Sequence, residues 1–159
     1  MKKLKPNYIL IPLFTLTIAI LGSTITAAGM EWYKTINLPG WTPPGNVIGT
    51  VWTILFILAT ISALMVWNAK FKAKTRKLIF LTFGANALLN FAWSYLFFGL
   101  HFLATSAVEA SLLGLSVFVL IFLIWPVKKW AAILLIPYSL WVAFATYLTF
   151  VVFQLNTVT

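Results

Sequence analysis

Five long apolar stretches, separated by short segments that carry most of the charged residues, limit this chain to one class of fold. Each stretch is close to the roughly 20 residues that a helix needs to cross the hydrocarbon core of a bilayer. Of the 159 residues, 62% are hydrophobic and 8% are charged, whereas about 25% of the residues in a soluble domain are charged. We therefore predict an all-α integral membrane protein, a single five-helix bundle over residues 1–159 with spans near residues 8–28, 46–68, 78–99, 104–125 and 131–153.

The basic residues predict the orientation of this bundle. All but one of the eleven Lys and Arg lie before the first span, between the second and third spans, or between the fourth and fifth. These three places share one side of a five-span topology, and only Lys34 lies on the other. Because Lys and Arg concentrate in cytoplasmic loops, we predict an N-terminus inside and a C-terminus outside. The same rule explains the net charge of +9 without a nucleic-acid partner.

The first span also has a second interpretation. A lysine-rich start, an apolar run and then Thr26-Ala27-Ala28 are typical of a cleaved signal peptide. Cleavage would leave four spans. The apolar run is long for a signal peptide, so we prefer the five-span interpretation.

Few side chains in this sequence can carry acid–base, thiol or metal chemistry. There is no Cys, the carboxylates are Glu31 and Glu109, and the single imidazole is His101. These residues offer zinc at most three candidate ligands, and we predict no metal site. Glu109 falls in the fourth span, where it is either a structural hydrogen-bonding group or the coupling carboxylate of a small secondary transporter. His101 falls in an outer loop, as a polar loop residue or a haem ligand.

Polar and aromatic residues converge in the predicted outer half of the bundle. Asn86 and Asn90 are four residues apart and therefore share one helical face, which Trp93 continues. Trp52 and Trp141 also fall in the outer half, while the inner half shows no comparable convergence. The alternatives are hydrogen bonds between helices and simple helix packing. We predict an aromatic, weakly polar cavity that opens outward and suits a flat apolar ligand with a few polar edges.

The segment of residues 30–45 connects the first two spans on the outer side. Pro39, Pro43 and Pro44 stiffen its backbone, and Gly40 and Gly45 allow it to turn. Because it also contains two Trp and a Tyr, we predict a structured lid over the cavity.

Pro137 interrupts the predicted fifth span. It removes a backbone hydrogen bond there, so we expect a kink just before Trp141.

The fourth span has a stripe of small residues on one face, formed by Ser106, Ala110 and Gly114. Such a stripe is suited to close helix approach.

Three motifs in order along the chain resemble the tryptophan-rich sensory protein (TspO/MBR) family, the bacterial relatives of the mitochondrial translocator protein or peripheral benzodiazepine receptor. The match covers nearly the whole chain, and its most specific element is the first. The motifs are Trp41-Thr42-Pro43-Pro44 with Gly49-x-x-Trp52, Asn86-x-x-x-Asn90-x-x-Trp93-Ser94-x-x-Phe97-Phe98, and Pro137-Tyr138-x-x-Trp141-x-x-Phe144-Ala145.

The resemblance implies a multi-pass protein of a bacterial cytoplasmic membrane, often a homodimer. It implies a cavity that binds protoporphyrin IX and related tetrapyrroles, benzodiazepine drugs and isoquinoline-carboxamide drugs, with no obligatory cofactor. Some bacterial members degrade protoporphyrin in light and oxygen, and Trp52 and Trp141 match the two tryptophans tied to that reaction. With Trp93, which spacing adds, the implied ligand-binding residues are Ser23, Tyr33, Pro43, Ile48, Trp52, Asn86, Asn90, Trp93, Trp141 and Ala145.

One departure from the family concerns cholesterol. The animal motif in the fifth span requires a basic residue after its Tyr, and Tyr147 is followed by none. The sequence therefore gives no support for cholesterol binding of that kind.

Overall fold

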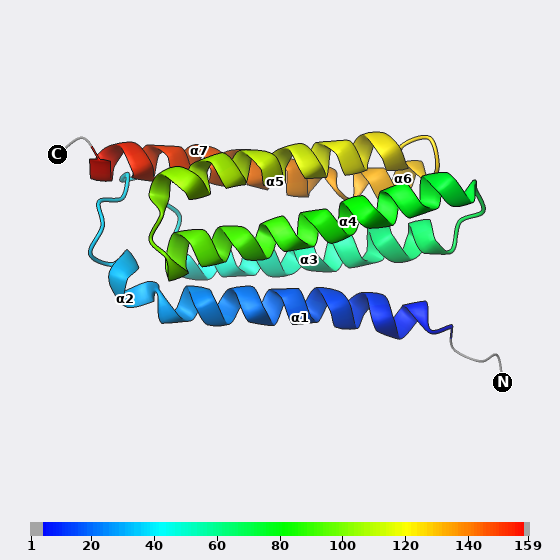
Figure 1. Ribbon diagram of the computed structural model, residues 1–159, viewed down its shortest axis with the longest axis horizontal. Coiled ribbons are helices and arrows are strands. Elements are labelled where there is room, and N and C mark those ends of the chain that lie inside the picture. Colours follow the sequence, from blue (N-terminus) through cyan, green and yellow to red (C-terminus); the bar gives the residue numbers. More distant parts are fainter. Residues whose placement is uncertain (1–4, 158–159) are drawn as a thin grey trace.

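Five long helices run side by side along the long axis of the molecule (Figure 1). The computed structural model describes residues 5–157, and within these residues every regular element is helical. The predicted fold class, five membrane-spanning helices in one bundle, is confirmed. The elements are α1 (Asn7–Ala28), α2 (Met30–Tyr33), α3 (Gly45–Trp67), α4 (Ala73–Ser94), the π-helix η1 (Tyr95–Gly99), α5 (Leu103–Ile124), α6 (Lys129–Ile133) and α7 (Ile136–Thr157).

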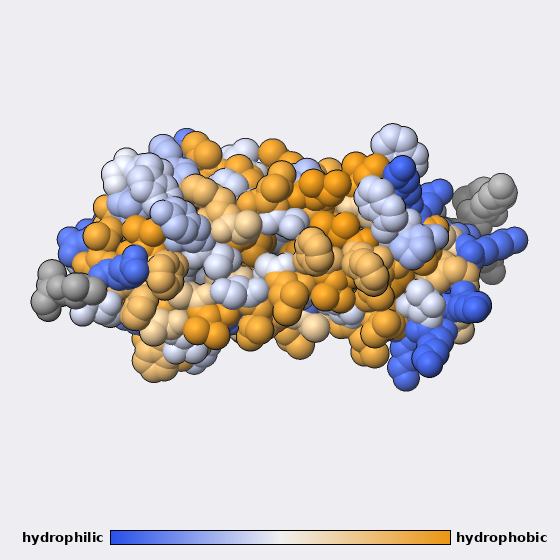
Figure 2. All heavy atoms as spheres, turned by 90° about the horizontal axis from the view of Figure 1, so that it is seen from above, coloured by the Kyte–Doolittle hydropathy of each residue, from blue (hydrophilic) through white to orange (hydrophobic). Residues whose placement is uncertain are grey.

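The surface of the bundle is mostly hydrophobic along its length, with hydrophilic residues at both ends (Figure 2), and most of the Lys and Arg residues belong to one of these ends. Leu88, Phe118 and Phe122 are more than 60% exposed, as expected of side chains that face lipid rather than water. We call the end with most of the Lys and Arg residues the basic end; its residues are Lys5, Lys70, Lys72, Lys74, Arg76, Lys77, Lys128 and Lys129. The other end, which holds α2 and the end of α7 (Figure 1), we call the far end. Which of these ends lies inside the cell stays a prediction. Two of the lysines on which that prediction rests, Lys2 and Lys3, lie outside the described residues.

The third span begins five residues earlier than predicted, at Ala73 rather than residue 78. Its first turns carry basic residues, which a search for apolar runs leaves out. Arg76 is held there because its Nη2 donates to the Ala69 carbonyl oxygen at 2.7 Å, and its guanidinium lies 5.1 Å from the centre of the Phe71 ring. Long basic side chains can extend a membrane helix into the interface in this way.

The fifth span is broken rather than kinked. α6 ends at Ile133 and α7 begins at Ile136, so the interruption precedes Pro137 by a few residues. Pro137 thereby lies in the first turn of α7, where its missing N–H costs no intrahelical hydrogen bond. The helix that carries Trp141 is continuous from that point.

Helix α5 is the centre of the packing, with α7 and α4 as its most extensive neighbours. The Thr146 hydroxyl of α7 donates to the Ala110 carbonyl oxygen of α5 at 3.1 Å. At Gly114, an added Cβ would lie 3.5 Å from Cγ1 of Val142, which is ordinary van der Waals contact. The small-residue stripe therefore does allow a close approach of α5 and α7, as predicted.

Helix α1 is the least buried of the five spans and packs against α3, α4 and η1. Its contact with η1 depends on Gly29, the residue that follows α1. A Cβ at Gly29 would lie 2.5 Å from the carbonyl oxygen of Phe98, closer than any real side chain tolerates. Away from this contact, spaces remain between α1 and the rest of the bundle, and two of them are cavities.

Candidate functional site

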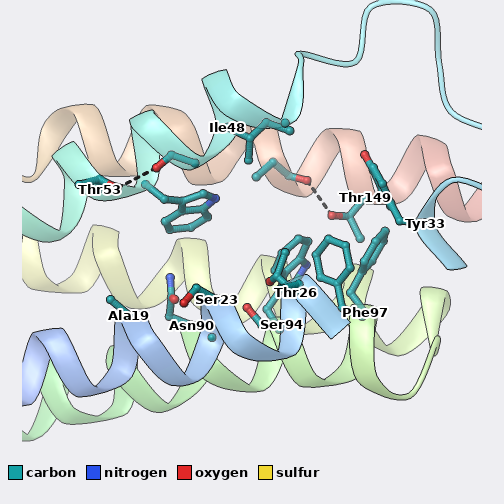
Figure 3. Close-up of a pocket in the computed structure, with 18 of the residues that line it drawn as sticks. Ala19, Ser23, Thr26, Tyr33, Ile48, Thr53, Asn90, Ser94, Phe97 and Thr149 are labelled. Carbon is teal, nitrogen blue, oxygen red and sulfur yellow. Dashed lines mark hydrogen bonds between the residues drawn. The ribbon is translucent and has the colours of Figure 1, made fainter. Parts of the chain in front are cut away.

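The larger cavity, which we call the aromatic cavity, has a volume of about 490 Å³ and lies toward the far end (Figure 3). Four of the five spans enclose it, and its walls are mostly apolar. Such a volume is typical of small-molecule sites. Its lining includes Ala19, Gly22, Ser23 and Thr26 of α1, Met30 and Tyr33 of α2, Ile48, Gly49, Trp52, Thr53 and Phe56 of α3, Asn90, Trp93, Ser94, Phe97 and Phe98 of α4 and η1, and Trp141, Phe144, Ala145, Leu148 and Thr149 of α7.

Two indole N–H groups in this cavity have no hydrogen-bond partner. The Nε1 atoms of Trp93 and Trp141 are buried, and neither donates to any described residue. Both side chains line the cavity, from α4 and α7 respectively. A buried donor without an acceptor costs roughly 1–3 kcal/mol. An acceptor on a bound ligand would remove that cost.

A polar network extends from the cavity wall at Asn90 into the packing between the helices. Asn90 Nδ2 donates to the Tyr138 hydroxyl at 3.3 Å, and that hydroxyl donates to Asn86 Oδ1 at 3.1 Å. Asn86 Nδ2 in turn donates to the Ser116 hydroxyl at 2.9 Å. The network joins α4 to α5 and α7, so both asparagines link helices. Only Asn90 also lines the aromatic cavity, beside Ser23 and Ser94 in Figure 3.

Aromatic rings close the cavity at the far end. Tyr33 lies 5.5 Å from Phe98 and 6.1 Å from Phe97 between ring centres, and Trp93 stacks on Phe97 at 5.2 Å. Burial raises the pKa of the Tyr33 hydroxyl above its ordinary value. Tyr33 therefore keeps its proton at neutral pH and can donate a hydrogen bond.

The predicted lid is attached to α7. Trp41 stacks on Tyr147 with ring centres 5.6 Å apart, and Asn37 exchanges two hydrogen bonds of 2.9 Å with the Asn156 side chain. The ends of the segment, Tyr33 and Gly45, line the cavity, whereas residues 34–44 do not. The segment thus packs over α7 and frames the far end of the cavity instead of filling it.

The structure brings together most of the residues that the sequence proposed for ligand binding. Pro43 lies in the segment over α7, and Asn86 lies outside the aromatic cavity. Sequence reasoning missed most of the α1 wall, including Gly22 and Thr26. The others line the aromatic cavity: Ser23, Tyr33, Ile48, Trp52, Asn90, Trp93, Trp141 and Ala145.

A second cavity of about 450 Å³ lies between the aromatic cavity and the basic end. The expectation that the inner half holds no convergence of aromatic and polar side chains is therefore wrong. Ile18, Phe56 and Asn90 line both cavities, and Asn86 lines the second. Further lining residues are Pro6, Asn7, Leu10, Ile11, Phe14, Thr15, Ala63, Trp67, Phe80, Phe83, Gly84, Ala87 and Tyr138.

Glu109 and His101 line neither cavity. Glu109 is 6% exposed within α5, and its carboxylate has no hydrogen-bond partner among the described residues. The His101 ring stacks on Trp32 with centres 3.9 Å apart. Within residues 5–157, no three His, Asp or Glu side chains gather into a group that could hold a metal ion.

Five apolar spans and an aromatic cavity of the size typical of small-molecule sites define a multi-pass integral membrane protein with a candidate ligand cavity. The chain belongs to the TspO/MBR family, whose family model matches residues 9–155. This confirms the resemblance drawn from the three motifs.

Relatives from bacteria and animals match most of the chain. An uncharacterized membrane protein, YtaB, of Bacillus subtilis is 35% identical over 90% of this chain and 93% of its own length. The tryptophan-rich protein TspO of Bacillus cereus is 34% identical over 96% of this chain and 99% of its own. The human translocator protein is 32% identical over 80% of this chain and 76% of its own.

Proposed function

We propose that this protein binds protoporphyrin IX in the aromatic cavity and serves as a membrane sensor or regulator of tetrapyrrole level. One observation carries the proposal: a cavity walled by aromatic rings is lined by two tryptophans whose buried indole N–H groups lack an acceptor among the described residues. Protoporphyrin is flat and largely apolar, with carboxylates at one edge that accept hydrogen bonds. It therefore supplies both the stacking surface and the acceptors that these walls lack.

Each wall has a distinct role in this proposal. Trp52 of α3 and Trp141 of α7 offer ring faces from two helices, and offset stacking of aromatic rings is favourable. The indole N–H groups of Trp93 and Trp141 donate to ligand acceptors. The protonated Tyr33 hydroxyl does the same at the far end, where the polar edge of a porphyrin would lie nearest the interface.

We propose that metal-free porphyrin is preferred to haem. Strong haem binding depends on an axial ligand such as His, and His101 is stacked on Trp32 outside the cavity. Met30 is the one thioether in the lining. Haem affinity equal to that of protoporphyrin, and lost in Met30→Leu, would contradict this preference.

Light-driven loss of the bound porphyrin is a further part of the proposal. The excited ring reacts with oxygen, so the ligand supplies the chemistry and the protein supplies position. Trp52 and Trp141 are the residues placed to exchange an electron with the ring. Benzodiazepine and isoquinoline-carboxamide drugs are expected to compete for the same cavity, and by family resemblance we propose a homodimer.

The test is a titration of the purified protein with protoporphyrin in the dark, followed by tryptophan fluorescence, and then illumination while the porphyrin spectrum is recorded. We expect saturable quenching that weakens in Trp52→Phe and Trp141→Phe. Trp130→Phe is the matched control, because Trp130 is 69% exposed at the basic end. Porphyrin loss under light should slow in the first two variants only. Absence of saturable quenching would reject the proposal.

A second candidate, a small secondary transporter, is favoured by Glu109 alone. A carboxyl group buried in a membrane span without a partner is a common proton carrier. The transporter hypothesis predicts pH-dependent uptake of a substrate into vesicles, and it predicts that Glu109→Gln abolishes this uptake. Uptake unchanged by that substitution would remove the candidate.

A further inference from the structure

The second cavity opens toward the bilayer. Leu10 and Phe14 of α1 line it and are nevertheless 61% and 50% exposed, so they form its rim rather than its floor. Most of its other walls are aliphatic or aromatic, from α1, α3 and α4. Hydrocarbon from the surrounding membrane therefore has direct access to it.

The length of the cavity matches one leaflet. Its lining runs along α1 from Asn7 to Ile18, which is about 16 Å at 1.5 Å per residue. The hydrocarbon core of a bilayer is about 30 Å thick. The cavity thus spans the depth that a single acyl chain of one leaflet occupies, and it begins at the interface.

An unused hydrogen-bond donor lies at the interfacial end. The Asn7 side chain lines the cavity, is 6% exposed, and its Nδ2 has no partner among the described residues. At the first turn of α1 it lies at the level where lipid ester and phosphate oxygens lie. These oxygens are acceptors, and they fit an amide N–H that has no partner among residues 5–157.

The charge around that end favours an anionic headgroup. Eight of the described Lys and Arg residues make up the basic end, and Lys5 lies two residues before Asn7. Neither carboxylate of the sequence is there, because Glu31 belongs to α2 and Glu109 to the half of α5 nearer the far end. Clusters of basic residues beside a membrane span attract anionic lipid headgroups by about 1 kcal/mol per residue.

We infer that the second cavity is a binding site for an anionic phospholipid, with one acyl chain between α1, α3 and α4 and the headgroup held by Asn7 at the basic end. The site shares Ile18, Phe56 and Asn90 with the aromatic cavity, and its remaining lining residues belong to the second cavity alone.

Native mass spectrometry in detergent tests the inference, with phosphatidylglycerol and phosphatidylcholine of identical acyl chains as probes. Gly84→Phe is the decisive variant: Gly84 lines the cavity, and an added Cβ meets no atom within 4 Å, so the change begins without a clash and adds bulk at the cavity wall. Gly84→Leu is the smaller version of the same change. Leu88→Phe is the control, because Leu88 is 64% exposed on the same helix and lines neither cavity.

We expect one phosphatidylglycerol per chain, bound about tenfold or more tightly than phosphatidylcholine, since the donor and the lysines act on the headgroup. Gly84→Phe should abolish this adduct, and Leu88→Phe should keep it. Asn7→Leu should weaken phosphatidylglycerol about tenfold through the lost charge-assisted hydrogen bond. Helical content and elution volume confirm that each variant is folded.

Three results would overturn the inference. Phosphatidylglycerol retained in both Gly84 variants would place the lipid elsewhere on the surface. Equal affinity for the two lipids would reject the anionic headgroup. Absence of any saturable adduct on the folded wild-type protein would reject the site.

Discussion

At the scale of single residues, the candidate site contains buried hydrogen-bond donors that have no partner among the described residues. These donors belong to side chains that line the aromatic cavity. The indole N–H groups of Trp93 and Trp141 are buried and have no acceptor among the described residues. Most buried polar groups in proteins are hydrogen-bonded. Asn86 and Asn90 are used differently, as members of a network that joins three helices. Unpaired donors on residues that line a cavity favour ligand binding, whereas paired amides favour a structural role.

Substitution of Trp141 by Phe should separate binding from stability. The change removes the unpaired donor and part of a ring face, so protoporphyrin affinity should fall about tenfold. Thermal stability should be unchanged or slightly higher, because the donor has no partner to lose. Dark titration and a melting curve of the same sample measure both. Loss of stability in parallel with loss of affinity would mean that Trp141 is only a packing residue.

Substitution of Gly49 by Leu should block the aromatic cavity directly. Gly49 lines it, and an added Cβ would meet no atom within 4 Å. The longer side chain would occupy ligand volume, so we expect at least about a tenfold loss of protoporphyrin affinity, comparable to the removal of a good contact. Gly40→Leu is the control, as its surroundings are also open but lie in the segment outside the cavity. Equal effects of the two changes would contradict the assigned cavity.

At the scale of elements, two contacts decide how the far end of the cavity is built. Gly29 lets α1 approach η1, and the Asn37–Asn156 pair ties the segment of residues 34–44 to α7. The first contact sets the wall that α1 provides, and the second sets how readily the far end opens.

Gly29→Ala should destabilise the protein and loosen α1. The added methyl would lie 2.5 Å from the Phe98 carbonyl oxygen, so the backbone of α1 or η1 has to move. Overpacking of this kind costs roughly 1–3 kcal/mol of stability. We expect a lower melting temperature in Gly29→Ala and no change in Gly40→Ala. An unchanged melting temperature in both would show that α1 is not seated on η1.

Asn156→Ala should speed ligand exchange without changing equilibrium affinity much. The substitution removes both hydrogen bonds to Asn37 and leaves every lining residue in place. Stopped-flow fluorescence should therefore show faster association and faster dissociation. A change in dissociation alone would mean that the segment contacts the ligand instead of gating it.

At the scale of the whole molecule, the sequence predicts the helices better than the spaces between them. Length and hydropathy predict the number of spans, and the tryptophans and Asn90 are conspicuous within them, so these residues could be assigned to the cavity in advance. The α1 wall could not, because an almost uniformly apolar helix gives no sign of which face turns inward. The second cavity was missed for the same reason, and Asn7 lies just before the predicted first span of residues 8–28.

Orientation is the whole-molecule prediction that the fold leaves open. Because the chain contains no Cys, single-cysteine variants give clean labels. In intact cells, Lys74→Cys should resist a membrane-impermeant maleimide and Thr35→Cys should react. The opposite pattern would invert the bundle and place the aromatic cavity toward the cytoplasm.

The most direct test of the central claim is the response of individual indole N–H groups to protoporphyrin. With ¹⁵N-labelled tryptophan in detergent, NMR resolves the eight indole signals, which Trp→Phe variants assign. We expect saturable, site-specific shifts for Trp93 and Trp141, with Trp125 and Trp130 at the basic end unaffected. Shifts confined to Trp125 and Trp130, or no saturable shift in any indole, would contradict it.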